Sequence, residues 1–579
     1  MTAQVATRSP AASPGLTRRP DLGTLLPYLL VLAVALLVGL LGLRPWQMPP
    51  SGAFADTGGD FFWMQAMFQV HGQSGVFGVS THLAWPDGAS PWSYPQLGML
   101  AGLFAWIVVG WFGVAATSAV LYFVAFAAGL NSVAVLFFFR SFIGSRLGWL
   151  AAAFSLSLGL SPFVLGRAYH ANLVAFFVVP IVLGVLARWG RGSARLGWWW
   201  VAAVAAAVAP MWWTVVMVLF VPALGIPGLA RRRWSEFVAV MVVWAAVIVG
   251  FAVQGLVTLV ATRPGETHVR GEWESNQFGG HLSDLLVGSP FLTDRFAVLQ
   301  EIAVGSSGDL VGLGMIPLLG AWVCFFAVVG LAPRTLASGA DVRLLSAAAP
   351  LSLLFFVAGG FGNFQAAAAV LAGTSSPARV WSRLLLVVAL IGLAWALVLI
   401  RDFLDRRRLT PTTVGAIATA AVILVAGALA LDLTALTRPM ATAAADLPEA
   451  ASLQYLDTAV DTSCPIAQLP QEGMPSPRVT VAMGDVDAYR GLVPYLLQPE
   501  RFWSFGSWVA GASGGLNSIA TTLDAPELAR VADLGFCAVL YDKQLAASAG
   551  EAELEGLTVA PEVSPDFDSP RFSVYLLPQ

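Results

Sequence analysis

The chain contains 579 residues, of which 57% are hydrophobic and only 11% are charged. A soluble domain usually carries about 25% charged residues, so this composition excludes a large soluble enzyme and a disordered protein. The formal net charge of −3 provides no basic surface and excludes a nucleic-acid-binding protein. Long apolar runs recur along most of the chain, which indicates a polytopic membrane protein.

A membrane-spanning helix needs about 20 mainly apolar residues, and about eleven stretches of the chain meet this requirement. They lie at approximately 25–43, 115–139, 147–165, 171–187, 196–210, 212–230, 236–259, 310–331, 344–361, 383–400 and 411–432. The first of them has no small-residue cleavage site after it, so we expect a span rather than a cleavable signal peptide. A twelfth apolar stretch, 97–112, has to be assigned from the charges around it.

The arginines select one of the two possible orientations, because cytoplasmic loops carry an excess of basic residues. With a cytoplasmic N-terminus, about 17 basic residues lie in cytoplasmic segments and about 7 in the outer loops. If 97–112 crossed the membrane, every later loop would change sides and this bias would be lost. We therefore expect 97–112 to lie on the outer face or to re-enter from it. Because every basic residue except Lys543 is an arginine and alanine is abundant, the sequence indicates a high-GC bacterium and hence a bacterial plasma membrane.

The chain divides into three predicted parts. Residues 1–24, rich in Pro, Ser, Thr and Arg, are expected to form a disordered cytoplasmic tail. Residues 25–432 are expected to form an all-α transmembrane domain with large outer loops at 44–114 and 260–309. Residues 433–579 alternate strand-like and helix-like runs, which favours a small extracytoplasmic α/β domain. The strand-like runs lie at 465–469, 537–541 and 572–577, and a helix-like run lies at 523–534.

Two carboxylates follow the first span in the segment Asp56-Thr-Gly-Gly-Asp60. A carboxylate at the start of a helix-like stretch can act as a general base on a substrate hydroxyl. It can equally be a helix cap at the membrane interface. Both readings stay open on the local sequence alone.

A turn rich in aromatic residues follows in the first outer loop, at His82-Leu-Ala-Trp85-Pro86-Asp87-Gly88. Pro-Asp-Gly favours a tight turn, and Trp is typical of the interface between membrane and water. His82 and Trp85 are candidate substrate-binding residues. The alternative is a structural loop that the tryptophan anchors.

Arginines occur in two outer turns, where the positive-inside tendency disfavours them. Arg167 stands in a short turn together with His170, and Arg379 and Arg383 stand four residues apart before a span. Cations at the start of a helix are electrostatically misplaced, and a bound phosphate would relieve that conflict. Contact with lipid headgroups is the alternative. His170 is a further candidate substrate-binding residue.

The second large outer loop contains His268 and Arg270 among several glutamates. We interpret it as a gate over an active site in which these two residues contact substrate, with a solvated loop as the alternative. A divalent metal stays open, but the spacing predicts no metal site. Cys464 and Cys537 lie in the extracytoplasmic part, where disulfides form, and each precedes or begins a strand-like run. We expect them to be joined, and Cys324 to be a packing residue inside a span.

This layout resembles the GT-C superfamily of integral-membrane glycosyltransferases, which use lipid-linked sugars. The matching segments are Gly59-Asp60-Phe-Phe-Trp63, Trp85-Pro86-Asp87-Gly88, Arg167-Ala-Tyr-His170-Ala-Asn-Leu173 and Ser376-Pro-Ala-Arg379-Val-Trp-Ser-Arg383, with Gln468-Leu469-Pro470, Trp503-Ser504-Phe505-Gly506 and Leu534-Gly535-Phe536 in the tail. The resemblance implies a GT-C-like fold and inverting transfer of a sugar from a polyprenyl phosphate to a glycan or lipid acceptor.

By the same resemblance, Asp60 is the general base, with Asp56 as the second candidate. Arg379, Arg383 and Arg167 are the residues that would hold the donor phosphate. No cofactor is expected, and no Gly-rich loop for a nucleotide is present in the sequence. Partners are then the lipid-linked donor, the acceptor and membrane lipids, without nucleic acid. Two other functions stay open: a transporter or flippase of a lipid-linked glycan, and a non-catalytic protein of cell-envelope assembly.

Overall fold

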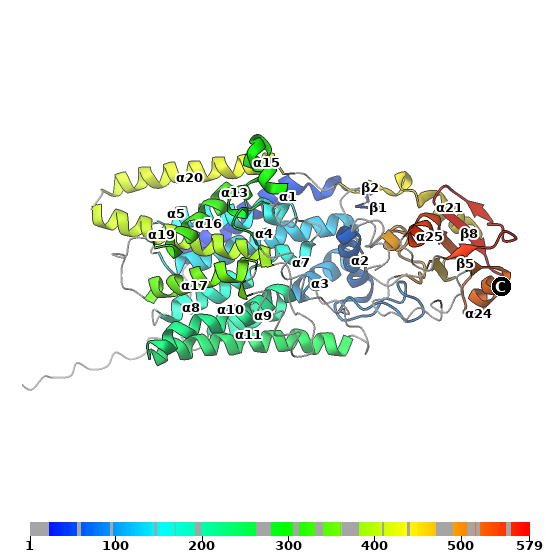
Figure 1. Cartoon of the computed structure of the whole chain (residues 1–579), viewed down its shortest axis with the longest axis horizontal. Coiled ribbons are helices and arrows are strands. Elements are labelled where there is room, and N and C mark those ends of the chain that lie inside the picture. Colours follow the sequence, from blue (N-terminus) through cyan, green and yellow to red (C-terminus); the bar gives the residue numbers. More distant parts are fainter. Residues whose placement is uncertain are drawn as a thin grey trace, which may run out of the picture.

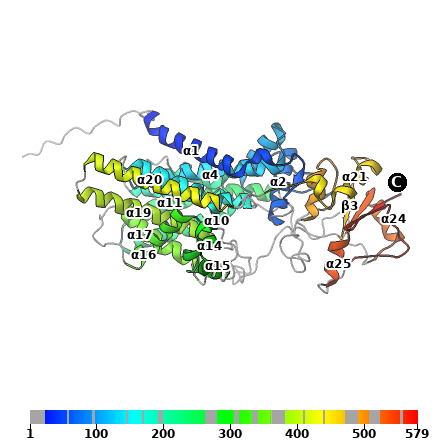
Figure 2. The same ribbon diagram turned by 90° about the horizontal axis from the view of Figure 1, so that it is seen from above.

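The computed structural model describes residues 22–54, 59–92, 97–143, 147–167, 170–190, 198–261, 280–304, 312–330, 340–358, 360–361, 381–407, 410–436, 440–470, 490–505, 516, 522–551 and 557–578. A bundle of helices and a smaller domain of strands and helices follow one another along the long axis of the molecule (Figure 1). The view from above shows the same order, with the C-terminal domain at one end of the bundle (Figure 2). The predicted tail 1–24 falls almost wholly outside the described residues.

Helices occupy all the predicted spans, which confirms the fold class of an α-helical multi-pass protein with a small α/β domain. Seven stretches in the described part of the chain are long and apolar enough to cross a membrane. These are α1 (Leu22–Leu43), α4 (Ala116–Arg140), α5 with α6 (Gly148–Gly159 and Pro162–Leu165), α10 (Met211–Ala230), α11 (Trp234–Ala261), α19 (Leu385–Arg407) and α20 (Pro411–Thr434). Shorter apolar helices occupy the other four spans, namely α8 (Val178–Gly190), α9 (Trp199–Val208), α16 (Met315–Val328) and α17 (Ala340–Phe356).

One end of the bundle gathers the arginine-rich turns. Arg401 donates from Nη1 to the carbonyl oxygen of Phe142 at 2.6 Å, and Arg188 donates from Nε to Ser141 Oγ at 3.1 Å. The guanidinium of Arg140 lies 5.1 Å from the centroid of the Tyr28 ring. The turns after α4, α8 and α19 therefore meet beside the first residues of α1.

The segment 44–115 begins and ends at the opposite end of the bundle. Ser118 Oγ, at the start of α4, donates to the carbonyl oxygen of Pro45 at 2.9 Å, just beyond the end of α1. An even number of crossings must therefore lie between α1 and α4. The apolar stretch in this segment forms α3 (Met99–Ala105) and the π-helix η2 (Trp106–Trp111), which pack on α2 (Gly59–Ser74) without crossing the bundle.

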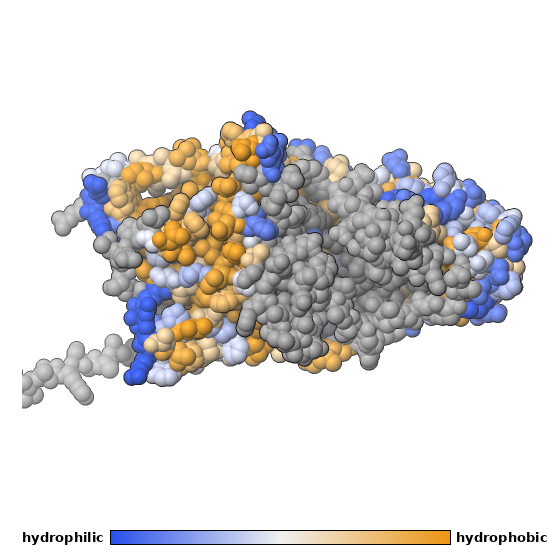
Figure 3. All heavy atoms as spheres, viewed as in Figure 1, coloured by the Kyte–Doolittle hydropathy of each residue, from blue (hydrophilic) through white to orange (hydrophobic). Residues whose placement is uncertain are grey.

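Exposed aromatic side chains mark both ends of the bundle. Trp149, Trp199, Trp200 and Trp234 are exposed near helix starts at the arginine-rich end, and Trp46, Phe77, Trp111 and Phe112 are exposed on the segment that joins α1 to α4. Aromatic residues of this kind gather at the two interfaces between membrane and water. Figure 3 shows hydrophobic side chains over the bundle, with hydrophilic ones at its left end and over the C-terminal domain.

The C-terminal domain is built on a four-stranded sheet in the order β3-β5-β8-β7. Its strands are β3 (Ile466–Leu469), β5 (Ala538–Asp542), β7 (Phe567–Asp568) and β8 (Phe572–Leu576); β3 and β5 are parallel and the other pairs antiparallel. The helices are α21 (Ala450–Ala459), α23 (Val493–Leu497), α24 (Ala525–Asp533) and α25 (Lys543–Glu551). Three predicted strands and the predicted helix at 523–534 are thus present.

Short elements complete the described chain. The 3-10 helices are η1 (Pro45–Gln47), η6 (Trp381–Leu384), η7 (Ala444–Asp446) and η8 (Arg490–Leu492). The short α-helices are α7 (Ala171–Val174), α13 (Asp284–Val287), α14 (Pro290–Arg295) and α15 (Ala297–Val304). The short strands are β1 (Gly52–Ala53), β2 (Thr442–Ala443), β4 (Thr522–Leu523) and β6 (Thr558–Val559).

A disulfide joins Cys464 and Cys537, as the sequence predicts, across 73 residues of chain. The two cysteines lie just before β3 and β5, and these strands pair in parallel from Ile466 and Ala538 onward. Parallel pairing brings the residues before both strands together, which gives a Cα–Cα distance of 5.8 Å.

The segment that joins α1 to α4 contacts the C-terminal domain at several points. β1 pairs with β2 in antiparallel fashion. The amide of Trp85 donates to the carbonyl oxygen of Trp503 at 2.9 Å, and Tyr495 Oη donates to Gln73 Oε1 at 2.8 Å. The bundle and the domain therefore share backbone and side-chain contacts on the side where α1 ends.

Helix α10 contains Pro222, whose missing N–H leaves the carbonyl oxygen of Val218 without its helical donor. Trp244 of α11 supplies a donor instead, from Nε1 at 2.9 Å. We expect Trp244→Phe to lower the free energy of unfolding by about 1 kcal/mol, because the partly buried carbonyl oxygen of Val218 loses its donor. Thermal unfolding of the purified protein measures this.

The matched control restores the helical donor. In a Pro222→Ala background the amide of residue 222 can bond Val218, so Trp244→Phe should cost clearly less there than in the wild type. Equal costs in the two backgrounds would contradict the assignment. Trp200→Phe, at an exposed position, should change stability little.

Candidate functional site

One of the predicted spans is interrupted inside the bundle. The predicted span 171–187 is not continuous: α7 ends at Val174, and α8 starts only at Val178. Asn131, near the middle of the 25-residue helix α4, donates from Nδ2 to the carbonyl oxygen of Val174 at 2.5 Å. Trp213 of α10 donates from Nε1 to the carbonyl oxygen of Leu173 at 2.7 Å.

These two side chains explain why irregular backbone persists at this depth. Inside a membrane every backbone polar group needs a protein partner, and helix ends leave carbonyl groups unpaired. Asn131 and Trp213 supply such partners and fix α7 between α4 and α10. We use the name recess for residues 160–167 and 170–177, where the helices are interrupted inside the bundle.

Arg167 lies in the recess and is fully buried. Its guanidinium carbon is 4.7 Å from the centroid of the Phe163 ring. A buried guanidinium gives its surroundings a positive potential that is screened far less than at a surface. His170 is half-buried in the same turn, and its amide donates to the carbonyl oxygen of Arg167 at 2.8 Å. The structure therefore brings these two predicted residues together.

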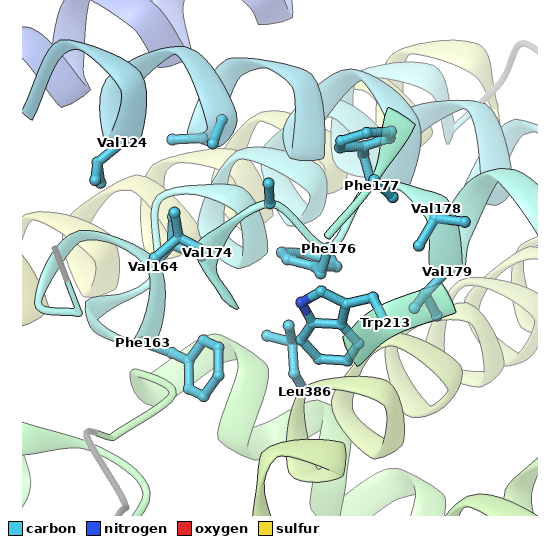
Figure 4. Close-up of a cluster of buried hydrophobic side chains, with 14 of the residues drawn as sticks. Val124, Phe163, Val164, Val174, Phe176, Phe177, Val178, Val179, Trp213 and Leu386 are labelled. Carbon is cyan, nitrogen blue, oxygen red and sulfur yellow. The ribbon is translucent and has the colours of Figure 1, made fainter. Parts of the chain in front are cut away.

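Arg383 reaches the same region from another part of the chain. It lies in η6, directly before α19, and its guanidinium carbon is 5.7 Å from the centroid of the Trp212 ring. The rings of Trp212 and Trp213 are 4.6 Å apart at nearly a right angle. Figure 4 shows Trp213 in one buried cluster with Phe163, Val174 and Leu386. Leu386 lies one helical turn after Arg383.

The two arginines thus border one cluster of buried hydrophobic side chains. Arg167 contacts it through Phe163, and Arg383 contacts it through Trp212. Aromatic faces hold guanidinium groups in place without neutralising their charge. The arrangement can attract and orient an anionic group such as a phosphate. Sequence reasoning missed Asn131, Phe163, Trp212 and Trp213; of these, the amide of Asn131 in an apolar helix was the detectable signal.

Asp60 is the second residue of α2, and the structure describes the helix there but not this side chain. The helix start is anchored in the core, because the Phe61 ring packs against that of Phe54 with ring centroids 4.5 Å apart and Phe62 is buried. Gln65 donates from Nε2 to the carbonyl oxygen of Gly52 at 2.8 Å. Asp60 therefore starts a fixed helix on the side of the bundle where α1 ends.

The other predicted site residues lie elsewhere or outside the described chain. The His82 ring stacks on Phe502 at 4.6 Å, and the Trp85 ring meets the edge of Phe536 at 4.9 Å, so both lie at the junction with the C-terminal domain. Asp56, Arg379, His268 and Arg270 fall outside the described residues. In the part that the structure describes, no group of three or more His, Cys, Asp or Glu side chains could hold a metal ion.

A buried histidine lies at the other end of α2. Burial lowers the pKa of His71 to about 4, because the charged ring would lose its hydration. Its Nδ1 lies 3.3 Å from the carbonyl oxygen of Gly75, and a Cβ added at Gly102 of α3 would come within 2.9 Å of the ring. The imidazole is therefore enclosed between α2 and α3.

His71 predicts a loss of stability in acid. Between pH about 6.5 and about 4 the unfolded chain binds a proton at this residue and the folded chain does not, so the free energy of unfolding should fall as the pH drops. The contribution amounts to about 3 kcal/mol over the whole interval. We expect His71→Gln to flatten the pH dependence of the melting temperature in this window. His281→Gln, at an exposed position, should leave it unchanged, and an equal slope in all three proteins would contradict the prediction.

No family model matches the chain, and no curated protein matches it by sequence. Among solved structures, the chain is similar to the oligosaccharyltransferase of Archaeoglobus fulgidus in complex with Zn and sulfate, with 14% identity, a TM-score of 0.41 and coverage of 90% of this chain and 69% of that one. It is also similar to the arabinofuranosyltransferase AftD from Mycobacteria, with 15% identity, a TM-score of 0.49 and coverage of 95% and 41%.

ArnT from Cupriavidus metallidurans in the apo state is a further similar structure, with 13% identity, a TM-score of 0.43 and coverage of 94% of this chain and 97% of that one. Similarities of this extent establish neither the family nor the activity of this chain. The function therefore has to be argued from its own residues.

Proposed function

We propose that this protein is a GT-C-type membrane glycosyltransferase that moves a sugar from a polyprenyl-phosphate donor to an extracytoplasmic glycan or lipid acceptor with inversion. The observation that carries the proposal is the position of Arg167 and Arg383 on aromatic rings that belong to one buried hydrophobic cluster inside the bundle. The solved structures named above include glycosyltransferases of this general layout, which agrees with the proposal.

In this mechanism the arginines bind the donor phosphate, with Arg379 as a third candidate four residues before Arg383. Asp60 accepts the proton of an acceptor hydroxyl, and the hydroxyl oxygen attacks the anomeric carbon from the face opposite the phosphate. The bond between that carbon and the phosphate oxygen breaks, and its electron pair stays on the phosphate. Because negative charge grows on the leaving phosphate, its contacts with the arginines strengthen in the transition state.

We place the arginine-rich end of the bundle in the cytoplasm of a bacterial plasma membrane, with the recess and the C-terminal domain on the extracytoplasmic side. The distribution of arginines and the Cys464–Cys537 disulfide support this orientation. His170 shares the turn of Arg167 and is the first candidate to contact the sugar. His82 and Trp85, at the domain junction, are candidates for contact with the acceptor, as are His268 and Arg270.

The decisive experiment is transfer from defined polyprenyl-phosphate sugars by the purified protein in nanodiscs. We expect Arg383→Gln to raise KM for the donor at least about tenfold, the loss of roughly one charge-assisted hydrogen bond. Arg295→Gln, which removes an exposed arginine of α14, is the matched control and should leave KM unchanged. Movement of the lipid-linked glycan across vesicle membranes without any sugar transfer would contradict the proposal and favour a transporter.

A further inference from the structure

A second polar site lies at the opposite end of the bundle from the recess. The ends of α8, α10, α11 and α17 pack around a cavity of about 80 Å³, large enough for a phosphate group. These helices lie together in the lower part of the bundle (Figure 1). The cavity belongs to the arginine-rich end and is independent of Asp60, Arg167 and Arg383.

Three arginines and one glutamate line this cavity, so its charged groups sum to a net +2. Arg343 Nη2 lies 2.8 Å from Glu236 Oε1, and Arg233 Nη1 lies 3.8 Å from Glu236 Oε2. Arg231 is exposed in the turn after α10 and completes the set. The single carboxylate orders two of the guanidinium groups and offsets only one of the three positive charges.

The turn that carries two of these arginines is fixed by backbone hydrogen bonds. The amide of Arg231 donates to the carbonyl oxygen of Pro227 at 3.2 Å, and the amide of Arg233 donates to that of Gly228 at 2.7 Å. Arg232 adopts a left-handed conformation with φ 54° between them. The neighbouring arginines are thus presented by a defined turn rather than by a mobile loop end.

The deeper wall of the cavity is apolar. Leu186, Leu224 and Val240 line it and are buried, and Ala347 of α17 lines it as well. Trp234, the first residue of α11, is exposed beside this turn, where a tryptophan at a helix start marks the membrane interface. The cavity therefore combines arginines at the depth of the lipid headgroups with a wall of apolar side chains deeper in the bundle.

We propose that this cavity binds the phosphate group of an anionic membrane lipid. The guanidinium groups provide several donors for phosphate oxygens, and the apolar wall accommodates the first methylene groups of the lipid. A free inorganic phosphate has the same charge but gains nothing from the apolar wall. Basic pockets between transmembrane helices are suited to such headgroups. This site does not depend on the proposed transferase activity.

The test uses the full-length protein, stripped of lipid in a neutral detergent. Phosphatidylglycerol, phosphatidylcholine or inorganic phosphate is added, and the melting temperature and the lipid retained in native mass spectrometry are measured. We expect stabilisation and retention with phosphatidylglycerol only. Equal effects of the two lipids would overturn the proposal. A shift with inorganic phosphate as large as with phosphatidylglycerol would overturn the assignment to a lipid.

Two variants separate this site from general attraction to the basic face. Arg231→Gln should weaken binding of phosphatidylglycerol about fivefold, whereas Arg407→Gln, which removes an exposed arginine at the same end, should not. Ala347→Phe keeps every charge but fills the apolar wall, and it should also abolish the selective effect. If Arg231→Gln and Arg407→Gln weaken binding equally, or if Ala347→Phe has no effect, the cavity is not the binding site.

Discussion

Asp60→Asn is expected to reduce sugar transfer by about 10²–10⁴-fold, the usual contribution of a general base. Asparagine keeps the size of the side chain, but it cannot accept the proton of the acceptor hydroxyl. Because the start of this helix is anchored through Phe61 and Gln65, the fold should survive the change. Initial rates with a saturating polyprenyl-phosphate donor, together with the melting temperature, measure both effects.

Two controls decide whether Asp60 is the base. Asp56→Asn should have a much smaller effect, and Asp294→Asn, at an exposed position in α14, should have none. Wild-type rates in Asp60→Asn combined with a collapse in Asp56→Asn would move the role to Asp56. Full activity in both variants would remove the catalytic assignment.

The second large effect is expected from the disulfide. The Cys464–Cys537 bond closes a loop across 73 residues, and loop-closure entropy for that length corresponds to about 4 kcal/mol of stability in the chain-entropy model. Replacing both cysteines with serine should therefore destabilise the C-terminal domain by an amount of this order. The loss of stability is measured by titrating the full chain with denaturant and following protease cleavage after residue 440.

Cys324→Ala provides the comparison, because this buried cysteine in α16 forms no disulfide. Its removal should leave protease susceptibility of the C-terminal domain unchanged. Reduction of the wild-type protein should reproduce the behaviour of the double serine variant. Wild-type resistance in the double variant would show that the strand pairing alone holds the domain.

The spans and the strands could be predicted because each depends on local composition. Twenty apolar residues can satisfy their backbone only as a helix in a membrane, and the short β-like runs around Ile466 and Ala538 form strands where they were expected. The disulfide between Cys464 and Cys537 could be predicted because both cysteines lie in the expected extracytoplasmic part and next to strand-like runs. These features need no knowledge of distant contacts.

The recess could not be predicted, because the groups that stabilise it come from other helices. The segment 171–187 is apolar apart from Asn172, and Pro180 in the first turn of α8 is a local signal against a continuous helix. The groups that bind the carbonyl oxygens of Leu173 and Val174, however, are the indole of Trp213 and the amide of Asn131, which lie on other helices. Arg167 and Arg383 were each predicted to bind a phosphate. That they border one hydrophobic cluster depends on contacts between distant segments, such as that of Arg383 with Trp212, 171 positions earlier, and periodicity does not encode such contacts.

The arginines after α10 illustrate a different shortfall. In the sequence they served only to orient the chain, because a run of three basic residues after a span is sufficient for that purpose. Their pairing with Glu236 and Arg343 requires α10, α11 and α17 to meet, and this is a property of the packed bundle. The arginines that indicate the orientation of the chain are therefore also part of the proposed lipid-binding cavity.

The pairing of β1 with β2 has a consequence for the architecture of the whole chain. It joins the segment after the first span to the segment after the last one, and Trp85 adds a second attachment to the backbone of Trp503. A protein truncated near residue 436 would lack β2, so the backbone of Gly52 and Ala53 in β1 would lose its hydrogen-bonding partner. The C-terminal domain therefore cannot be exchanged as an independent module. A chimera with another protein has to include the segment between α1 and α4 together with the C-terminal domain.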